Sequence, residues 1–460
     1  MTPARGPTVF SLCLGLIACS SAAPTPENPW KSGVSLPNPT GLTSRGFLDK
    51  RGLIHAHSIY SHDACDNMPV KDGMRDQVCL EDFRRGICQS MHDFVMLTDH
   101  PTSYGETEYP ETMLYRPERG DVLIQRNGAP VANRSGCPDG RTVLIVPGME
   151  GGVMPVGMEK HLFPPGQRDY YGQSSTVAMA HHHEVNALVL AQHTEDWTPE
   201  DLVGDGFDGF EMYNLHANTL RGAGAVIELL FRVSEMKPGL PAPDLAVLPI
   251  WSEDERYIST WGSVLSRGAH KVTTMGTDCH RNTFPALLSD GERIDSYRRM
   301  MVWFSNHVLV RPGADGSFDD QALKDALKAG RSFGVLEAMG FEEGFDFYAE
   351  AAGVTHEMGE RLPFGASPKL TIKRPSVREL DTKRPAPEIV LRLLRAKEGG
   401  FDEVANAAVG DLSFTVTSTG AYRAEVRMVP HHLEADLGDF KDDVLAKNPV
   451  WIYSNAIYIE

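Results

Sequence analysis

Residues 52–63 read GLIHAHSIYSHD, a short apolar run that is followed at once by His55, His57 and Asp63. The run has the length of a buried β-strand. Residues two apart in a strand point to the same side, so His55 and His57 can bind one ion together. This stretch therefore predicts a strand that ends in metal ligands.

The same pattern recurs along the next 220 residues or so. Besides Gly52–His55, we expect β-strands over Phe94–Thr98, Val143–Val146, Ala187–Ala191, Gly209–Tyr213 and Lys271–Gly276. Helical spacing of apolar residues predicts helices over Leu80–Met91 and Ala223–Met236. Alternating strands and helices favour a parallel α/β sheet or barrel.

Further candidate ligands follow these strands: His100, Glu150, His161, His193, Asp278 and His280. The C-terminal ends of parallel strands converge on one face of a barrel, where such folds place their chemistry. A mixture of His and carboxylate ligands suits borderline divalent metals, and cations relieve the repulsion between crowded carboxylates. A single buried His is more often a hydrogen-bonded core residue, but the recurrence at successive strand ends favours a metal cluster.

These residues resemble the motifs of the PHP superfamily, the polymerase-and-histidinol-phosphatase domain of metal-dependent phosphoesterases, over roughly residues 48–340. The resemblance implies a distorted seven-stranded β/α barrel and three divalent metals, which would be zinc, manganese or iron. It assigns the first metal to His55, His57, Glu150 and Asp278, the second to Glu150, His161 and His193, and the third to Asp63, His100 and His280.

Other residues near the predicted ligands suggest supporting roles. Glu211 is expected to orient ligands from behind rather than to bind metal. Arg281 follows the last ligand and could neutralise a substrate phosphate, although a surface ion pair is equally compatible with its position. Cys279 lies between two ligands and is expected to pack against the strand's other face. We expect the catalytic residues to be Asp63, Glu150, His193 and Arg281.

The N-terminus indicates export. Residues 1–18 have the short apolar core of a signal peptide, and Leu16-Ile17-Ala18-Cys19 resembles the bacterial lipoprotein box. The resemblance implies lipid on Cys19, and Ser20 favours an outer-membrane location; a plain secretion signal is the alternative. Residues 19–46 are expected to form a flexible tether. The rest of the chain would be extracytoplasmic, with the lipid as its only membrane contact.

Five cysteines remain once Cys13 and Cys19 are set aside: Cys65, Cys79, Cys88, Cys137 and Cys279. An oxidising compartment favours pairing. Two bridges within residues 65–137 are expected, with three possible pairings.

The C-terminal third of the chain has a different sequence pattern. A helix is expected over Ser317–Gly330, and residues 47–340 are taken as the barrel. Residues 341–460 alternate in the manner of a small β-sandwich, with strands expected over Leu370–Ile372, Glu388–Leu394, Leu412–Ser418, Ala421–Val429 and Val450–Ile459. A packing module for the barrel is the simplest role for this part; glycan or partner binding is the alternative.

Composition narrows the function classes. The chain has 460 residues, a formal net charge of −18 and 41% hydrophobic residues, which excludes a disordered protein and argues against nucleic acid as a bulk partner. We expect a phosphoesterase in which a hydroxide bridging two metals attacks phosphorus. Its substrate would be a small-molecule or polymer phosphoester, with phosphomonoesters as the first choice. The alternatives are an amidohydrolase-like enzyme that cleaves C–N or C–O bonds and a catalytically inactive cell-surface binding protein.

Overall fold

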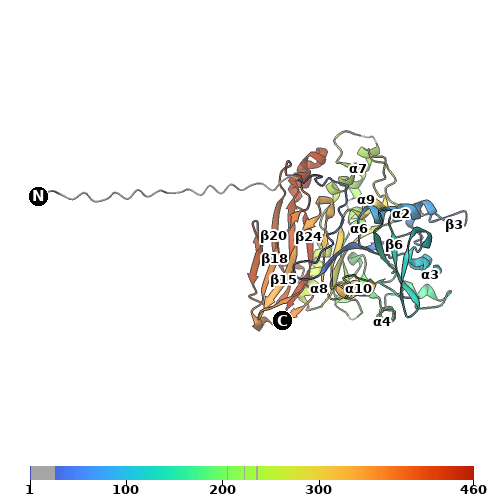
Figure 1. Ribbon diagram of the computed structural model, residues 1–460, viewed down its shortest axis with the longest axis horizontal. Coiled ribbons are helices and arrows are strands. Elements are labelled where there is room, and N and C mark those ends of the chain that lie inside the picture. Colours follow the sequence, from blue (N-terminus) through green and yellow to red (C-terminus); the bar gives the residue numbers. More distant parts are fainter. Residues whose placement is uncertain (2–25, 205, 222, 235–236) are drawn as a thin grey trace.

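The computed structural model describes residues 1, 26–204, 206–221, 223–234 and 237–460. The predicted signal peptide and lipoprotein box, with Cys19, lie outside the described residues. The described chain is a mixed α/β fold in which one large, 16-stranded mixed sheet is accompanied by helices (Figure 1). Within the described residues, no helix has both the length and the apolar character needed to cross a membrane.

The six predicted strands of the N-terminal part are all present, as β1 (Leu48–Ala56), β4 (Phe94–Met96), β7 (Thr142–Val146), β9 (Leu188–Ala191), β10 (Gly209–Asn214) and β11 (Val272–Cys279). They run parallel in the order β7-β4-β1-β11-β10-β9. Their C-terminal ends therefore lie along one edge, and the predicted ligands follow those ends.

Neighbouring residues of these strands pack on opposite faces, as period-two alternation requires. Leu53 and the residues beside it in the neighbouring strands pack on one face of the sheet, under α2 (Gln77–Gln89) and α9 (Tyr297–Met301). Ile54 and its equivalents pack on the other face, together with apolar residues of α10 (Asp320–Lys328). Both faces of the parallel strands are thus buried, which explains why the strands read as nearly continuous apolar runs.

The remaining short elements connect or flank these layers. The helices are α1 (Ala64–Asn67), α3 (Pro101–Glu106), α4 (Thr176–Glu184), α5 (Pro199–Val203), α6 (Leu215–Arg221), α7 (Ala223–Ser234), α8 (Glu255–Ser266) and α11 (Lys441–Lys447). The short strands are β2 (Val70–Lys71), β3 (Met74–Arg75), β14 (Glu342–Glu343), β17 (Arg361–Leu362) and β19 (Ser376–Val377).

The segment Pro101–Arg141, between β4 and β7, contains regular structure. A hairpin of β5 (Val122–Arg126) and β6 (Ala129–Gly136) extends the sheet beside β7. On the other side, β8 (Met154–Val156) runs antiparallel to β9, and Gly148 forms an isolated bridge with Val156.

The large sheet continues directly into the C-terminal part. β12 (Ser305–Val310) pairs with β1, followed in order by β13 (Ser332–Val335), β24 (Val450–Ile459), β23 (Gly420–Val429), β20 (Glu388–Lys397) and β21 (Gly400–Ala407). A separate four-stranded sheet has the order β16 (Val354–His356), β15 (Asp346–Ala351), β18 (Lys369–Lys373) and β22 (Leu412–Thr415). One apolar core joins both sheets, with Phe347 and Leu370 on one side and Leu391 and Val426 on the other.

Part of the predicted tether lies against this body. Within residues 26–46, the Trp30 side chain is buried and its backbone N–H donates to the carbonyl of Glu379. Arg45 forms an ion pair with Asp346 of β15. In its described part, this segment therefore packs on the C-terminal sheets.

Two disulfides join Cys65 to Cys79 and Cys88 to Cys137, so they select one of the three possible pairings. Cys279 is a free thiol, buried in the apolar layer beneath α2, where packing was expected. Because Cys79 and Cys88 both belong to α2, this helix is linked to the chain at both of its ends.

Candidate metal centre

Four predicted ligands meet at the edge formed by β1, β7 and β11. The Nε2 atoms of His55 and His57 each lie 3.2 Å from Glu150 Oε2 and 3.2 Å from Asp278 Oδ1. Ligands at 2.0–2.1 Å from a tetrahedral zinc ion stand about 3.3 Å apart. The spacing of these four atoms therefore fits a single divalent ion.

Several atoms of this cluster are buried without any hydrogen-bond partner. They are His55 Nε2, His57 Nε2, Asp278 Oδ1 and His280 Nε2. An unsatisfied buried polar atom costs about 1–3 kcal/mol. Coordination of a cation would satisfy these atoms together, so the residues present fit a metal ion.

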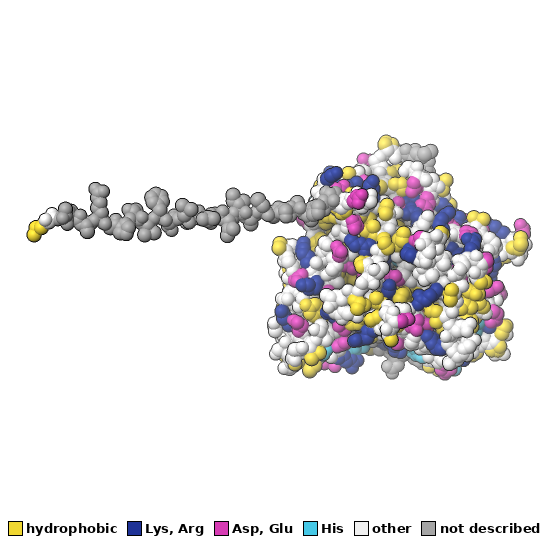
Figure 2. Space-filling model, viewed as in Figure 1, with side chains coloured by type: hydrophobic (Ala, Val, Ile, Leu, Met, Phe, Trp, Pro, Cys, Tyr) yellow, Lys and Arg dark blue, Asp and Glu magenta, His cyan; other side chains and the backbone are white. Residues whose placement is uncertain are grey.

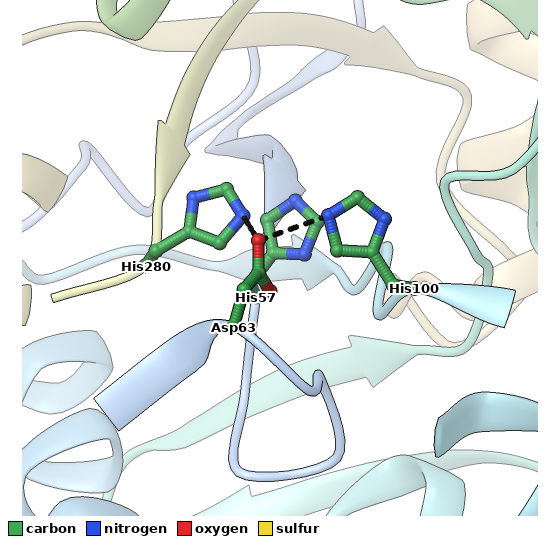
Figure 3. Close-up of side chains that lie close together, drawn as sticks. All are labelled: His57, Asp63, His100 and His280. Atoms are coloured by element: carbon green, nitrogen blue, oxygen red, sulfur yellow. Dashed lines mark ion pairs between the residues drawn. The ribbon is translucent and has the colours of Figure 1, made fainter. Parts of the chain in front are cut away.

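A second group of ligands adjoins the first (Figure 3). Asp63 Oδ2 lies 3.1 Å from the Nε2 atoms of both His100 and His280. The His57 and His280 rings stack with their centroids 3.8 Å apart. Nδ1 of His280 is 2.9 Å from the backbone carbonyl of Asp278. A proton donated along that hydrogen bond leaves Nε2 of His280 free to bind metal.

His193 lies on the other side of Glu150. Its Nε2 is 3.1 Å from Glu150 Oε1, and its Nδ1 is 3.2 Å from Glu195 Oε1. Glu150 thus faces His193 with one oxygen and His55 and His57 with the other, as a bridging ligand would.

His161 is the one predicted ligand that the structure does not bring to this cluster. Its Nε2 lies 2.8 Å from the carbonyl of Thr107 and its Nδ1 lies 3.1 Å from the hydroxyl of Tyr171. Its ring also packs against Tyr104 and Tyr109. Both ring nitrogens are therefore occupied by protein partners.

Arg281 is also engaged elsewhere. Its Nε lies 2.9 Å from Asp82 Oδ2 on α2, which matches the ion-pair alternative for this residue.

The structure adds residues that the sequence did not indicate. Nδ1 of His216 lies 3.3 Å from Asp278 Oδ2, and Tyr257 of α8 donates a hydrogen bond to Glu195. His216 follows the end of β10 by two positions, so the strand-end pattern could have included it. Tyr257 and Glu195 come from separate helical segments, and no local pattern marks either residue.

Glu211 is fully buried behind the ligands. Its Oε1 lies 2.6 Å from His55 Nδ1, and its Oε2 accepts hydrogen bonds from the His193 backbone N–H and from Asn214. A Cβ atom at Gly276 would lie 1.9 Å from Glu211 Oε1, so this position needs glycine. Such a carboxylate fixes the orientation of a ligating His and raises its basicity, which is the role expected for Glu211.

The backbone is strained at several ligands. The φ angle is +79° at His55, +46° at His193 and +53° at Asp278. The pairing register between β1 and β11 also shifts between Ile54 and Ala56. Left-handed backbone costs of the order of 1–3 kcal/mol at a non-glycine residue and persists where surrounding structure imposes it, often at functional sites.

The site's electrostatics favour ionised carboxylates. Burial raises the pKa of Asp278, but His55 and His280 outweigh that effect and hold this pKa well below its usual range. Burial lowers the pKa of His193, but its hydrogen bonds to Glu150 and Glu195 reverse the effect and raise it to about 11. A proton on His193 thus occupies the place of a cation, and metal binding would displace it.

Comparison of the chain with protein-family models, curated proteins and solved structures found no match. The fold and the site by themselves define a mixed α/β protein with clusters of His, Asp and Glu that could bind metal ions.

Proposed function

We propose that the protein is a metal-dependent hydrolase whose first substrate class is phosphoesters. The observation that carries the proposal is the set of buried, unpartnered ring nitrogens and carboxylate oxygens, spaced for cation binding at the ends of parallel strands. Zinc, manganese and iron suit this mixture of ligands.

The strand order supports a barrel of the PHP type. The bridge between Gly148 and Val156 adds β8 beside the end of β7, and β8 pairs with β9. We infer that β1, β4, β7, β8, β9, β10 and β11 form a distorted seven-stranded barrel, and that the two C-terminal sheets form a β-sandwich packed against it.

The exposure of the ligands indicates where substrate would approach. His55, His57 and Asp278 form the floor, with at most 1% of each side chain exposed. Asp63, His100 and His193 are 23–30% exposed and form the rim. Metal ions held here would lower the pKa of water and stabilise charge developing on substrate oxygens. The chain's own part is to hold Glu150 between two sets of histidines and to fix His55 through Glu211.

The first test is phosphate release from a panel of phosphoesters by the zinc- or manganese-loaded protein. His55→Asn and Asp278→Asn each remove a floor ligand, so we expect metal content and activity to fall together, activity by at least about 100-fold. His431→Asn, which changes a half-buried histidine bonded to Glu434, is the matched control and should retain activity. Full activity in the doubly substituted His55→Asn/Asp278→Asn protein would refute the assignment.

One observation favours a second candidate, hydrolysis of a C–N or C–O bond in an uncharged substrate. Among the described residues, the ion pairs of Asp63, Glu150 and Asp278 are all with histidines, and Arg281 pairs with Asp82. In the part of the chain that the structure describes, no ion pair thus joins an Arg or Lys to these three carboxylates. Cleavage of amides, lactones or carboxyl esters with phosphoesters untouched would support this candidate, and ligand binding without turnover would support an inactive cell-surface binding protein.

We also propose that the protein is anchored outside the cytoplasm through lipid on Cys19. Incorporation of labelled palmitate in a bacterial host should be abolished by Cys19→Ala and retained by Cys13→Ala. Absence of label from the parent protein would leave a plain secretion signal as the better account, and equal labelling of both variants would place the lipid on another residue.

A further inference from the structure

His216 faces the candidate metal centre from an element with no predicted ligand. β10 ends at Asn214 and α6 begins at Leu215, which places His216 in the first turn of that helix. Nδ1 of His216 lies 3.3 Å from Asp278 Oδ2, and Nε2 of His193 lies 3.5 Å from the same oxygen. The other oxygen of Asp278 faces His55 and His57. Oδ1 of Asp278 also lies 3.3 Å from Nδ1 of His280, so histidines lie at both oxygens of Asp278, with His193 and His216 at Oδ2.

The position of His216 is fixed by its neighbour Asn214. The Asn214 side-chain oxygen accepts a hydrogen bond from the backbone N–H of Ala217, and its side-chain nitrogen donates to Glu211. The same buried Glu211 contacts His55 and the backbone of His193. The buried Glu211 carboxylate thus links the segment that carries His216 to two predicted ligands, His55 and His193.

His161, by contrast, is committed to other partners. Leaving its present position would break its contacts with Thr107 and Tyr171. Tyr104 and Tyr109, which bond to each other through their hydroxyls, also pack around its ring. The family resemblance assigns Glu150, His161 and His193 to the second metal. Without His161, this position has one ligand fewer in this chain.

We propose that His216, and not His161, completes this position, so that one ion is held by His193, His216, Asp278 Oδ2 and Glu150 Oε1. The ion would be a divalent metal of the zinc, manganese or iron type, because two imidazoles and two carboxylates suit that class. Asp278 would then bridge two ions in the same way as Glu150. The assignment rests on the metal centre of the proposed function, but not on the identity of the substrate.

The alternative role for His216 is to hold Asp278 by a hydrogen bond alone. His216→Asn separates the two roles, because an amide can still donate to Asp278 but is a poor metal ligand. His161→Ala is the matched control, since it removes a histidine that the resemblance assigns to the same ion.

The test counts metal ions in the full-length protein. Parent, His216→Ala, His216→Asn and His161→Ala are stripped with a chelator, reloaded with Zn²⁺, freed of excess metal and analysed for zinc per chain. We expect both His216 variants to bind one equivalent less than the parent, and His161→Ala to bind the parental number. Far-UV circular dichroism and thermal unfolding of the metal-free forms confirm that each variant is folded; a His216→Ala protein that fails to fold leaves His216→Asn to decide.

Three results of the metal counts would overturn the assignment of His216. If His216→Ala or His216→Asn binds as much zinc as the parent, His216 either only positions Asp278 or has no role at the site. If His161→Ala binds one equivalent less than the parent, His161 is the ligand after all. A parent that binds no zinc, and no manganese or iron when reloaded with those ions, would refute both this inference and the metal centre. A parent that binds zinc but hydrolyses no phosphoester would refute the proposed function alone and leave the assignment of His216 to the zinc counts.

Discussion

Glu211 connects two candidate ligands, His55 and His193, from behind the cluster. It contacts His55, Asn214 and the backbone of His193, and it occupies space that only glycine at position 276 leaves open. Because a carboxylate behind a ligating His holds the ring and raises its basicity, we expect Glu211→Gln to weaken metal affinity by about 10–100-fold. Competition with a fluorescent zinc chelator measures this effect. Glu184→Gln, at the exposed end of α4, is the control; equal affinities for both variants would contradict the role of Glu211.

His307 is a titrating group far from the proposed ligands. It is buried on β12, with Asp49 2.9 Å away and Glu337 and Glu342 nearby. Burial lowers the pKa of His307, but Asp49 outweighs this and raises it to about 10. Burial raises the pKa of Glu342 to about 7, so that group has largely titrated above pH 7.5.

A folded-state pKa above the unfolded value means that the stability from His307 is complete below about pH 6.5 and is lost as the pH rises through 10. The advantage of the parent over His307→Gln in free energy of unfolding should therefore shrink by about 2–3 kcal/mol between pH 7.5 and 9.5. Urea titrations at the two pH values measure this difference. A constant advantage would show that His307 does not titrate in this range.

The sequence allowed individual ligands to be predicted where a strand end marks them, as at His55 and Asp278. It did not allow the direction of a loop side chain to be predicted. His161 has the spacing of a ligand, but the Thr107 carbonyl and the Tyr171 hydroxyl occupy its nitrogens, and no pattern around His161 indicates these contacts. His216 lies in the first turn of α6, two positions after β10 ends, and was not included among the strand-end residues.

At the scale of elements, two disulfides link α2 to the rest of the chain, and we expect their removal to have different effects. Cys65–Cys79 closes a loop of 14 residues next to Asp63, where Cys65 and Asp66 have positive φ angles, whereas Cys88–Cys137 closes one of 49 residues on the far end of the helix. Loop-closure entropy predicts losses of about 3 and 4 kcal/mol, respectively, when each bridge is removed.

We expect the Cys65→Ser/Cys79→Ser protein to lose zinc from the Asp63 group, because the segment that holds this ligand is freed. The Cys88→Ser/Cys137→Ser protein should lose more stability but keep its zinc. Urea unfolding and zinc content measured on both proteins test this contrast. Loss of zinc in the second protein alone would contradict it.

Elements with a strong apolar period were predictable, and the six parallel strands illustrate this. The β5–β6 hairpin was missed, because β5 is exposed or half-buried and the burial of β6 does not alternate regularly. A local signal was nevertheless available: Asn127 and Gly128 at the turn both have positive φ angles, which is the preference of a tight hairpin turn.

On the scale of the whole molecule, β24 joins the two predicted domains. Its residues are buried along the whole strand, which pairs with β13 on one side and β23 on the other. Figure 1 shows these C-terminal strands packed alongside the helix-rich part, and Figure 2 shows basic and acidic side chains interspersed over the face in view. The sequence could not reveal this continuity, because pairing between strands more than a hundred residues apart leaves no local pattern.

Asn455 of β24 forms hydrogen bonds across this junction. Its side chain accepts a hydrogen bond from the Thr273 backbone N–H on β11 and donates to the carbonyls of Thr273 and Ser332. Asn455→Ala leaves these buried groups unpaired at about 1–3 kcal/mol each, so we expect a loss of at least about 3 kcal/mol. Because β24 belongs to the common sheet, unfolding should remain a single transition with a lower midpoint in urea.

The control is Asn406→Ala, at the exposed β21 edge, which should change the free energy of unfolding by less than about 0.5 kcal/mol. Two separate transitions in Asn455→Ala, one at the parental midpoint, would instead mean that residues 341–460 fold independently of the parallel strands.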